Sequence, residues 1–384
     1  MPQSFSCIHF PRCGGCTALD ESYKEQLIKK REELLKLFSG TGVEIPAVVP
    51  SPRPIHYRHK VQLPFGAKGK RELVLGCYAS DSHKIINQKE CVLQDPDLTA
   101  SAHAIRDWAR GTGLGAYDER SGNGFFRHVL LRRGAGTGEI LIGIVTNGSR
   151  PHSSRNLARS LLDKVNRVIS TERSRVVGIV QNINTRNTNV VLGQREETWW
   201  GKPFFIETLG RYSFKVGLST FFQVNPFQTP QLYDLVKERV PSGSSVLDVY
   251  CGVGSITLWL SDKACRVTGV EENRHSVQVA RQSAVHNKVG NVRFHAGDAS
   301  EMIPDFSGCN DVAVVDPPRK GLEERALAAL RDSSLKRIVY VSCNPRTLAR
   351  DAKLLSCRWK LVSLTGVDMF PHTDHVECVS VLER

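Results

Sequence analysis

From about residue 221 onward, short apolar runs alternate with longer amphipathic stretches. Such alternation is typical of strands and helices that build a sheet covered by helices on both faces. Seven strands are predicted, over residues 246–249, 267–271, 292–294, 312–315, 337–341, 361–370 and 376–382. The last two strands leave no room for a helix between them. We therefore expect a terminal hairpin, which makes this doubly wound α/β sheet mixed.

The first part of the chain shows a different pattern. Apolar residues such as Leu27 and Leu34 recur at helical spacing, which predicts a helix over residues 21–39. Asp20 is placed to cap the start of this helix, and Gly40 to end it.

Shorter apolar runs follow this helix. The strand-like runs cover residues 129–132, 140–145, 176–181 and 189–192. They predict a mostly antiparallel sheet with a few helices, that is, an α+β unit. We divide the chain into residues 1–95, an N-terminal region with the start of the central domain; 96–220, the central α+β domain; and 221–384, the α/β domain.

Composition narrows the class of protein. No stretch reaches the roughly 20 consecutive apolar residues that a membrane helix needs, and the first residues do not form a basic and then apolar leader. We predict a soluble, cytoplasmic, monomeric protein that does not bind membranes. Its 11 cysteines are an odd number, which favours reduced thiols, metal ligands or catalysis over a disulfide framework.

The net charge of +13 is unevenly distributed. Residues 1–220 hold 32 Lys and Arg against 20 Asp and Glu, a net of +12, whereas residues 221–384 hold 20 against 19, a net of +1. A basic module beside a nearly neutral one suggests that the first holds a polyanion such as nucleic acid and the second modifies it. Solubility is the alternative explanation for the same charge.

The predicted strands of the α/β domain end in residues suited to a nucleotide-type cofactor. The first runs into a turn containing Gly252 and Gly254, and the second ends at Glu271, where a carboxylate can bind ribose hydroxyls. Asp298 and Asp316 follow the next two strands. The glycine turn alone is weak evidence for a cofactor site. The turn followed in order by Glu271, Asp298 and Asp316 is stronger evidence.

Cys343 ends a further apolar run and is followed by Asn344 and Pro345. A thiol displayed at a strand end with a base nearby is suited to covalent catalysis, and Glu377 lies in a later acidic segment. Taken singly, a cysteine beside a strand is more often a packed small side chain, and such a glutamate is more often solvated.

A second group of cysteines occupies the N-terminus. Cys7, Cys13 and Cys16 are close in sequence, and Cys91 follows after a long gap. Thiolates at this spacing serve either zinc or an iron–sulfur cluster. Zinc sites more often show two close pairs, so three clustered cysteines with one distant partner favour a cluster.

Several strings together resemble the S-adenosylmethionine-dependent RNA uracil-C5 methyltransferase family over nearly the whole chain. The most specific strings are residues 221–225 (FFQVN), 316–321 (DPPRKG), 342–345 (SCNP) and 370–377 (FPHTDHVE). The closest likeness is to the branch that methylates bacterial 23S ribosomal RNA, in its shorter subgroup without an N-terminal TRAM barrel. Tyr250 departs from the pattern, since relatives have phenylalanine there.

The resemblance implies a Rossmann-like class I methyltransferase domain, preceded by an α+β domain carrying a 4Fe-4S cluster on Cys7, Cys13, Cys16 and Cys91. It implies that Cys343 is the nucleophile and Glu377 the base. The implied S-adenosylmethionine contacts are Gln223, Tyr250, Ser255, Glu271, Asp298 and Asp316.

The chemistry of uracil explains these residue types. C5 is a poor nucleophile until a thiolate adds to C6, and a base must later remove the C5 proton so that the adduct breaks down. The target uridine must also leave its stack, which favours a loop or bulge. Two alternatives remain: the same reaction on the T-loop uridine of transfer RNA, and a non-catalytic RNA-binding or assembly protein.

Basic residues interleaved with an aromatic one predict RNA contact in the first part of the chain, because cations hold phosphates and a ring stacks on a base. The predicted contacts are Arg58, His59, Lys60, Phe126, Arg127, His128, Arg132 and Arg133.

Overall fold

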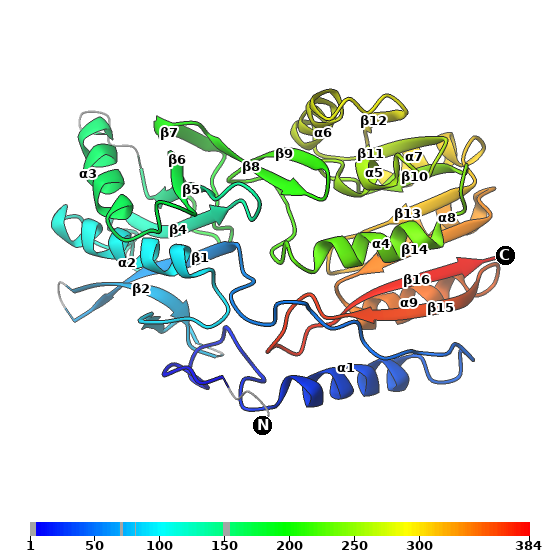
Figure 1. Cartoon of the computed structure of the whole chain (residues 1–384), viewed down its shortest axis with the longest axis horizontal. Coiled ribbons are helices and arrows are strands. Elements are labelled where there is room, and N and C mark those ends of the chain that lie inside the picture. Colours follow the sequence, from blue (N-terminus) through cyan, green and yellow to red (C-terminus); the bar gives the residue numbers. More distant parts are fainter. Residues whose placement is uncertain (1–4, 70–71, 81, 149–153) are drawn as a thin grey trace.

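The computed structural model describes residues 5–69, 72–80, 82–148 and 154–384. Two seven-stranded sheets lie at opposite ends of the molecule, joined by a two-stranded hairpin (Figure 1). The hairpin consists of β8 (Phe204–Leu209) and β9 (Tyr212–Gly217). One apolar cluster runs from Leu130 of the first sheet through Phe214 of the hairpin to Val246 of the second, so the hairpin connects the two cores.

The C-terminal sheet has the strand order β12-β11-β10-β13-β14-β16-β15. Its strands are β10 (Ser245–Val249), β11 (Arg266–Glu271), β12 (Val292–Ala296), β13 (Val312–Val315), β14 (Arg337–Ser342), β15 (Lys360–Val367) and β16 (Glu377–Glu383). The first five are parallel, and β16 is antiparallel to both β14 and β15. The predicted mixed sheet and its terminal hairpin are confirmed.

Helices connect these strands and cover both faces of the sheet (Figure 1). They are α4 (Thr229–Arg239), α5 (Ser255–Leu260), α6 (Arg274–His286), α7 (Ala299–Ser307), α8 (Glu324–Asp332) and α9 (Pro345–Leu355). The strand order reverses at β10, which lies between β11 and β13. In open α/β sheets, ligands bind outside the carboxyl ends of the strands at such a reversal.

The N-terminal sheet has the order β3-β2-β1-β4-β5-β6-β7, and α2 (Pro96–Gly111) and α3 (Ser154–Asn166) pack on it. Its strands are β1 (Lys60–Lys68), β2 (Glu72–Tyr78), β3 (Ile85–Asn87), β4 (Phe126–Arg133), β5 (Glu139–Thr146), β6 (Arg175–Ile183) and β7 (Arg195–Gly201). Only β5 and β6 pair in parallel among the described strands of this sheet. The prediction of a mostly antiparallel sheet is therefore confirmed.

The strand predicted over residues 189–192 is wrong. This segment is a loop before β7. The side-chain amide of Asn184 donates to the carbonyls of Val190 and Val191, at 2.7 and 3.0 Å. These bonds fold the loop back on itself, so its carbonyls bond to Asn184 and not to a neighbouring strand.

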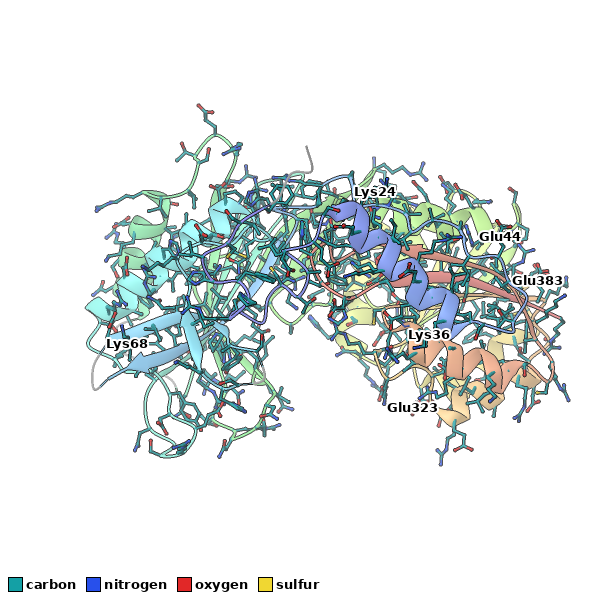
Figure 2. All side chains as sticks on the ribbon, turned by 90° about the horizontal axis from the view of Figure 1, so that it is seen from below. Lys24, Lys36, Glu44, Lys68, Glu323 and Glu383 are labelled. Atoms are coloured by element: carbon teal, nitrogen blue, oxygen red, sulfur yellow. The ribbon has the colours of Figure 1, made fainter. Side chains whose placement is uncertain are left out.

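The predicted N-terminal helix is α1 (Tyr23–Leu37), and Ser22 caps it through a reciprocal bond with Glu25. Asp20, the predicted cap, lies outside this arrangement. Leu34 is fully buried in the core of the C-terminal domain. In Figure 2, α1 crosses that domain with Lys24 and Lys36 near its two ends. The region predicted as residues 1–95 is therefore divided in space between the two domains.

None of the helices in the described parts of the chain is long and apolar enough to cross a membrane.

Candidate active site

A tight turn follows β10 at the point where the strand order reverses. Tyr250 and Gly254 have positive φ angles of 66° and 81°. A Cβ atom on Gly254 would lie 2.8 Å from the Phe294 ring, so only glycine fits there. The turn brings the chain from β10 directly into α5, whose first residue is Ser255.

Glu271 lies at the end of β11, directly beside this turn. One carboxylate oxygen accepts the Gly252 amide at 3.1 Å, and the other accepts the Asn273 amide at 2.8 Å. The parallel register pairs Val249 with Val270, so the acid and the glycine turn lie at the same edge of the sheet. An acid at a strand end beside a glycine turn is an arrangement that suits the ribose of a nucleotide-type cofactor.

The other predicted cofactor residues occupy the same edge of the sheet. Asp298 caps α7, and its bonds to Ser300 hold the pKa of its carboxyl below the usual range. Ser255 is 2.9 Å from the hydroxyl of Tyr233, an α4 residue that the sequence did not indicate. Asp316 follows β13, and burial raises its pKa to about 7.

Gln223 lies in the segment before α4. The Val224 carbonyl accepts the His59 amide at 3.0 Å, and the side-chain amide of Asn225 donates to the Met369 carbonyl at 3.0 Å. These bonds fix the segment between the two domains. The half-buried side chain of Gln223 makes no hydrogen bond to the described residues, so its amide is available to a ligand.

Cys343 and Glu377 lie side by side. The last pair of β14 and β16 is Ser342 with Cys378, so Cys343 directly follows β14 where Glu377 begins β16, and the charge of Glu377 acts on the thiol. Opposed residues such as Ser342 and Cys378 have Cα atoms about 4.5–5.5 Å apart. The thiol is half-buried, and the Glu377 side chain is buried. The two candidate catalytic residues thus share one edge of the sheet with Asp316.

Burial and charge set the protonation of this pair. Burial raises the pKa of the Cys343 thiol to about 11, assisted by the nearby carboxylates of Glu377 and Asp316. Burial raises the pKa of Glu377 to about 8, with a further increase from Asp316. The positive charge of Arg319 opposes both shifts. A positively charged ligand beside these groups would therefore favour the thiolate and the carboxylate.

The sequence did not indicate two further residues of this region. Arg319 is exposed near the thiol, and its carbonyl accepts the Asn344 side-chain amide at 3.1 Å. Its position directly after the two prolines of the 316–321 string could have indicated from the sequence that Arg319 lies near the site. Asp248, fully buried in β10, accepts a hydrogen bond from Thr257, and burial raises its pKa to about 7.

The four predicted metal ligands meet in the N-terminal part of the molecule. Cys7, Cys13, Cys16 and Cys91 line one pocket, which a fifth cysteine, Cys77, and Arg58 also border. Arg58 donates to the Gly15 carbonyl at 2.9 Å. Within the described residues, no three thiol, imidazole or carboxylate groups are placed to hold a single metal ion. Five thiols thus border this pocket, and four of them are the ligands predicted from the sequence.

The prediction of RNA contact is wrong for four residues, because each is buried: His59, Phe126, Arg127 and Arg132. Phe126 packs against Phe65 and Trp108, so no base can stack on it. Arg127 donates to the carbonyls of Asn184 and Arg186, both at 2.8 Å. The guanidinium groups of Arg127 and Arg132 donate to internal carbonyls, so they are not available to bind a phosphate.

The other four predicted RNA contacts are all half-buried, but they differ in their partners. Arg58 borders the cysteine pocket, and Arg133 bonds to Ser174 at 2.8 Å and to the Arg173 carbonyl at 2.9 Å. Both guanidinium groups are thus engaged by the protein. Lys60 and His128 are half-buried, and contact with RNA stays a prediction for them.

A seven-stranded mixed sheet with an acid-tipped β11 beside a glycine turn defines the C-terminal domain as a class I methyltransferase. Residues 211–384 match the model of the tRNA (uracil-5-)-methyltransferase family. An uncharacterised RNA methyltransferase of Leptospira interrogans is 45% identical over 390 residues, covering 100% of this chain and 99% of that protein. The chain belongs to the family of S-adenosylmethionine-dependent RNA uracil-C5 methyltransferases.

Two further relatives cover nearly the whole chain. An uncharacterised RNA methyltransferase of Clostridium tetani is 39% identical over 98% of this chain and 82% of its own length. Among solved structures, the tRNA (uracil-54, C5)-methyltransferase of Pyrococcus abyssi in complex with S-adenosyl-L-homocysteine has a TM-score of 0.78 and 28% identity. That match covers 98% of this chain and 86% of that one.

Proposed function

We propose that the protein methylates C5 of a specific uridine in 23S ribosomal RNA, with Cys343 as nucleophile and Glu377 as base. The observation that carries this proposal is their neighbouring placement, Cys343 directly after β14 and Glu377 at the start of the paired strand β16. A thiol and a carboxyl close together at the cofactor edge of the sheet provide both groups that the reaction needs.

The reaction follows from these two groups. The Cys343 thiolate adds to C6 of the uracil, which forms a carbon–sulfur bond and places electron density at C5. C5 then takes the methyl group from the sulfonium of S-adenosylmethionine, and S-adenosylhomocysteine leaves. The Glu377 carboxylate removes the C5 proton, the C6–sulfur bond breaks, and the thiolate and the methylated uridine separate. A carboxyl with a pKa of about 8 is well matched to accept this proton near neutral pH.

RNA in which 5-fluorouridine replaces uridine tests the chemistry and the substrate together. Fluorine at C5 cannot be removed as a proton, so the adduct should persist on a denaturing gel with S-adenosylmethionine and a 23S transcript. Cys343→Ala should form none, whereas Cys357→Ala, which removes an exposed cysteine elsewhere, should match the wild type. Equal trapping by Cys343→Ala would refute the nucleophile assignment.

The same assay separates the two RNA substrates. The Pyrococcus abyssi enzyme acts on uridine 54 of transfer RNA, which makes the T-loop uridine the second candidate. An adduct with a transfer RNA transcript and none with the 23S transcript would favour that candidate. If neither transcript forms an adduct, the result would favour the remaining alternative, an RNA-binding protein that does not catalyse this reaction.

We further propose that Cys7, Cys13, Cys16 and Cys91 hold a 4Fe-4S cluster. Their convergence on one pocket supports it, and Arg58 borders the same pocket with a positive charge of the kind that favours thiolates. The cluster would tie the N-terminal segment to the loop after β3. In this proposal the cluster has a structural role, and no step of the methyl transfer involves it.

Protein purified without oxygen should contain about four iron atoms and four sulfides per chain, as the cluster formula requires. Cys13→Ser should lower both contents strongly, because the serine hydroxyl is a poor substitute for a thiolate. Cys265→Ser, at an exposed cysteine, is the matched control and should change neither. Zinc in place of iron, or full iron content in Cys13→Ser, would contradict the proposed cluster.

A further inference from the structure

The turn that precedes Glu377 is held by the N-terminal segment of the chain. Thr17 donates its amide to the His372 carbonyl at 3.1 Å, and the Ala18 amide lies 3.3 Å from the same oxygen. The hydroxyl of Thr17 also accepts the Asp374 amide at 3.0 Å. Thr17 directly follows Cys16, so one short stretch connects the cysteine pocket to the turn.

Gln26 of α1 fixes the same turn from inside the protein. Its side chain is 2% exposed. The Oε1 atom accepts the His372 amide at 2.9 Å, and Nε2 donates to the Ala18 carbonyl at 2.8 Å. His372 has a φ of 63°, a left-handed conformation that a non-glycine residue adopts only when its surroundings impose it. The bond to Gln26 is one of the contacts that impose it.

Two more residues hold the chain between β15 and the turn. The ammonium of Lys30 lies 2.7 Å from a carboxylate oxygen of Asp368 and 3.2 Å from the Phe370 carbonyl. Tyr57 donates its hydroxyl to the Pro371 carbonyl at 3.0 Å. The whole path from the end of β15 to Asp374 is thus anchored by residues from the first part of the sequence.

Glu377 itself lacks such an anchor. Its Oε2 atom is buried and has no hydrogen-bond partner among the described residues. The position of its carboxyl therefore depends on the backbone that enters β16, and that backbone is set by the turn. A shift of about 1 Å in a catalytic group can cost about 100-fold in rate.

We propose that Thr17 and Gln26 are positioning residues for Glu377, so that the N-terminal segment controls the release step of methyl transfer. The inference rests on the proposed function, in which Glu377 removes the C5 proton. Loss of either residue should leave thiolate addition and methyl transfer largely intact, because Cys343 directly follows β14, and the side-chain bonds of Thr17 and Gln26 go to the turn and to the N-terminal segment and not to that strand. Only removal of the proton, and hence release of the RNA, should slow.

The test compares two variants of Thr17. Thr17→Val keeps the shape of the side chain but loses the hydroxyl that accepts the Asp374 amide, whereas Thr17→Ser keeps that hydroxyl. Gln26→Leu is the stronger variant, and Glu32→Gln, on the exposed face of the same helix, is the control. With S-adenosylmethionine and a 23S transcript of natural uridine, Thr17→Val and Gln26→Leu should release RNA roughly 10- to 100-fold more slowly. The covalent adduct should accumulate, with unchanged S-adenosylmethionine affinity. Thr17→Ser and Glu32→Gln should behave as the wild type.

Amide hydrogen exchange of the peptide spanning residues 371–377 provides a readout that needs no RNA. Exchange at His372 and Asp374 should quicken in Gln26→Leu and Thr17→Val, respectively. Faster exchange with normal release, or unchanged exchange, would overturn the inference while leaving the proposed function intact. A wild-type protein that forms no adduct with either 5-fluorouridine transcript would overturn the proposed function and the inference together. The trapping assay identifies that case separately.

Discussion

Replacing Glu377 by glutamine is expected to leave the protein covalently attached to RNA of natural uridine, a state that the wild type should pass through without accumulating. The amide has nearly the shape of the carboxyl but cannot accept the C5 proton. Loss of a general base typically costs 100- to 10,000-fold. Because the thiol of Cys343 is unchanged, addition and methyl transfer still proceed, and the methylated adduct should persist on a denaturing gel.

The pH dependence of release gives a second readout of the same variant. Release requires the carboxylate form of Glu377, whose pKa is about 8, so the wild-type rate should rise between about pH 7 and pH 9. Glu377→Gln should lose this rise. Glu383→Gln, at the opposite end of β16, is the control and should release normally. Rapid, complete release by Glu377→Gln would show that another group is the base.

Replacing Lys30 by methionine is expected to destabilise the protein by about 3–5 kcal/mol, the usual cost of removing one partner from a buried ion pair. The side chains of Lys30 and Asp368 are 4% and 0% exposed and lie 2.7 Å apart. Without the ammonium, the Asp368 carboxylate is left buried and uncompensated. The free energy of unfolding, measured in urea, should fall accordingly.

The neighbouring lysine provides a matched control for this measurement. Lys29 pairs with Glu21 at 2.8 Å, but its side chain is 63% exposed. An exposed pair contributes about 0–1 kcal/mol, so Lys29→Met should change stability little. The double variant Lys30→Met with Asp368→Leu should recover much of the loss, because neither charge remains buried. Equal losses from Lys29→Met and Lys30→Met would contradict this account.

The C-terminal sheet could be predicted from the sequence because each of its strands is a short apolar run with a helix or a turn after it. The runs at residues 246–249 and 312–315 coincide closely with β10 and β13. The hairpin of β15 and β16 was also predictable, since no helix fits between the strands. The order of the strands was not, and it is this order that places β16 against β14 and brings Glu377 near Cys343.

The predicted RNA contacts failed for a physical reason. Charge in a sequence does not show whether a guanidinium faces solvent or an internal carbonyl. Arg132 donates to the Gly217 carbonyl at 2.9 Å and is 2% exposed, although its position beside Arg133 suggested a basic surface. The role of α1 was likewise hidden, because Gln26 and Lys30 read as ordinary polar positions of an amphipathic helix. Both are buried, and both bond to the segment between β15 and β16, which lies far from them in the sequence.

The junction of α1 with the turn before β16 has a consequence for biosynthesis. A chain made from its N-terminus completes α1 early, yet Lys30 and Gln26 find their partners only when residues 368–374 have emerged from the ribosome. Lys30 and Gln26 therefore lack their hydrogen-bond partners while the chain from α1 to residue 368 is being translated. A nascent chain lacking its final strand could already contain the cofactor turn and the thiol, but neither Glu377 nor a means of releasing RNA. Docking of α1 on the turn before β16 thus couples the release of RNA to synthesis of the chain through Glu377.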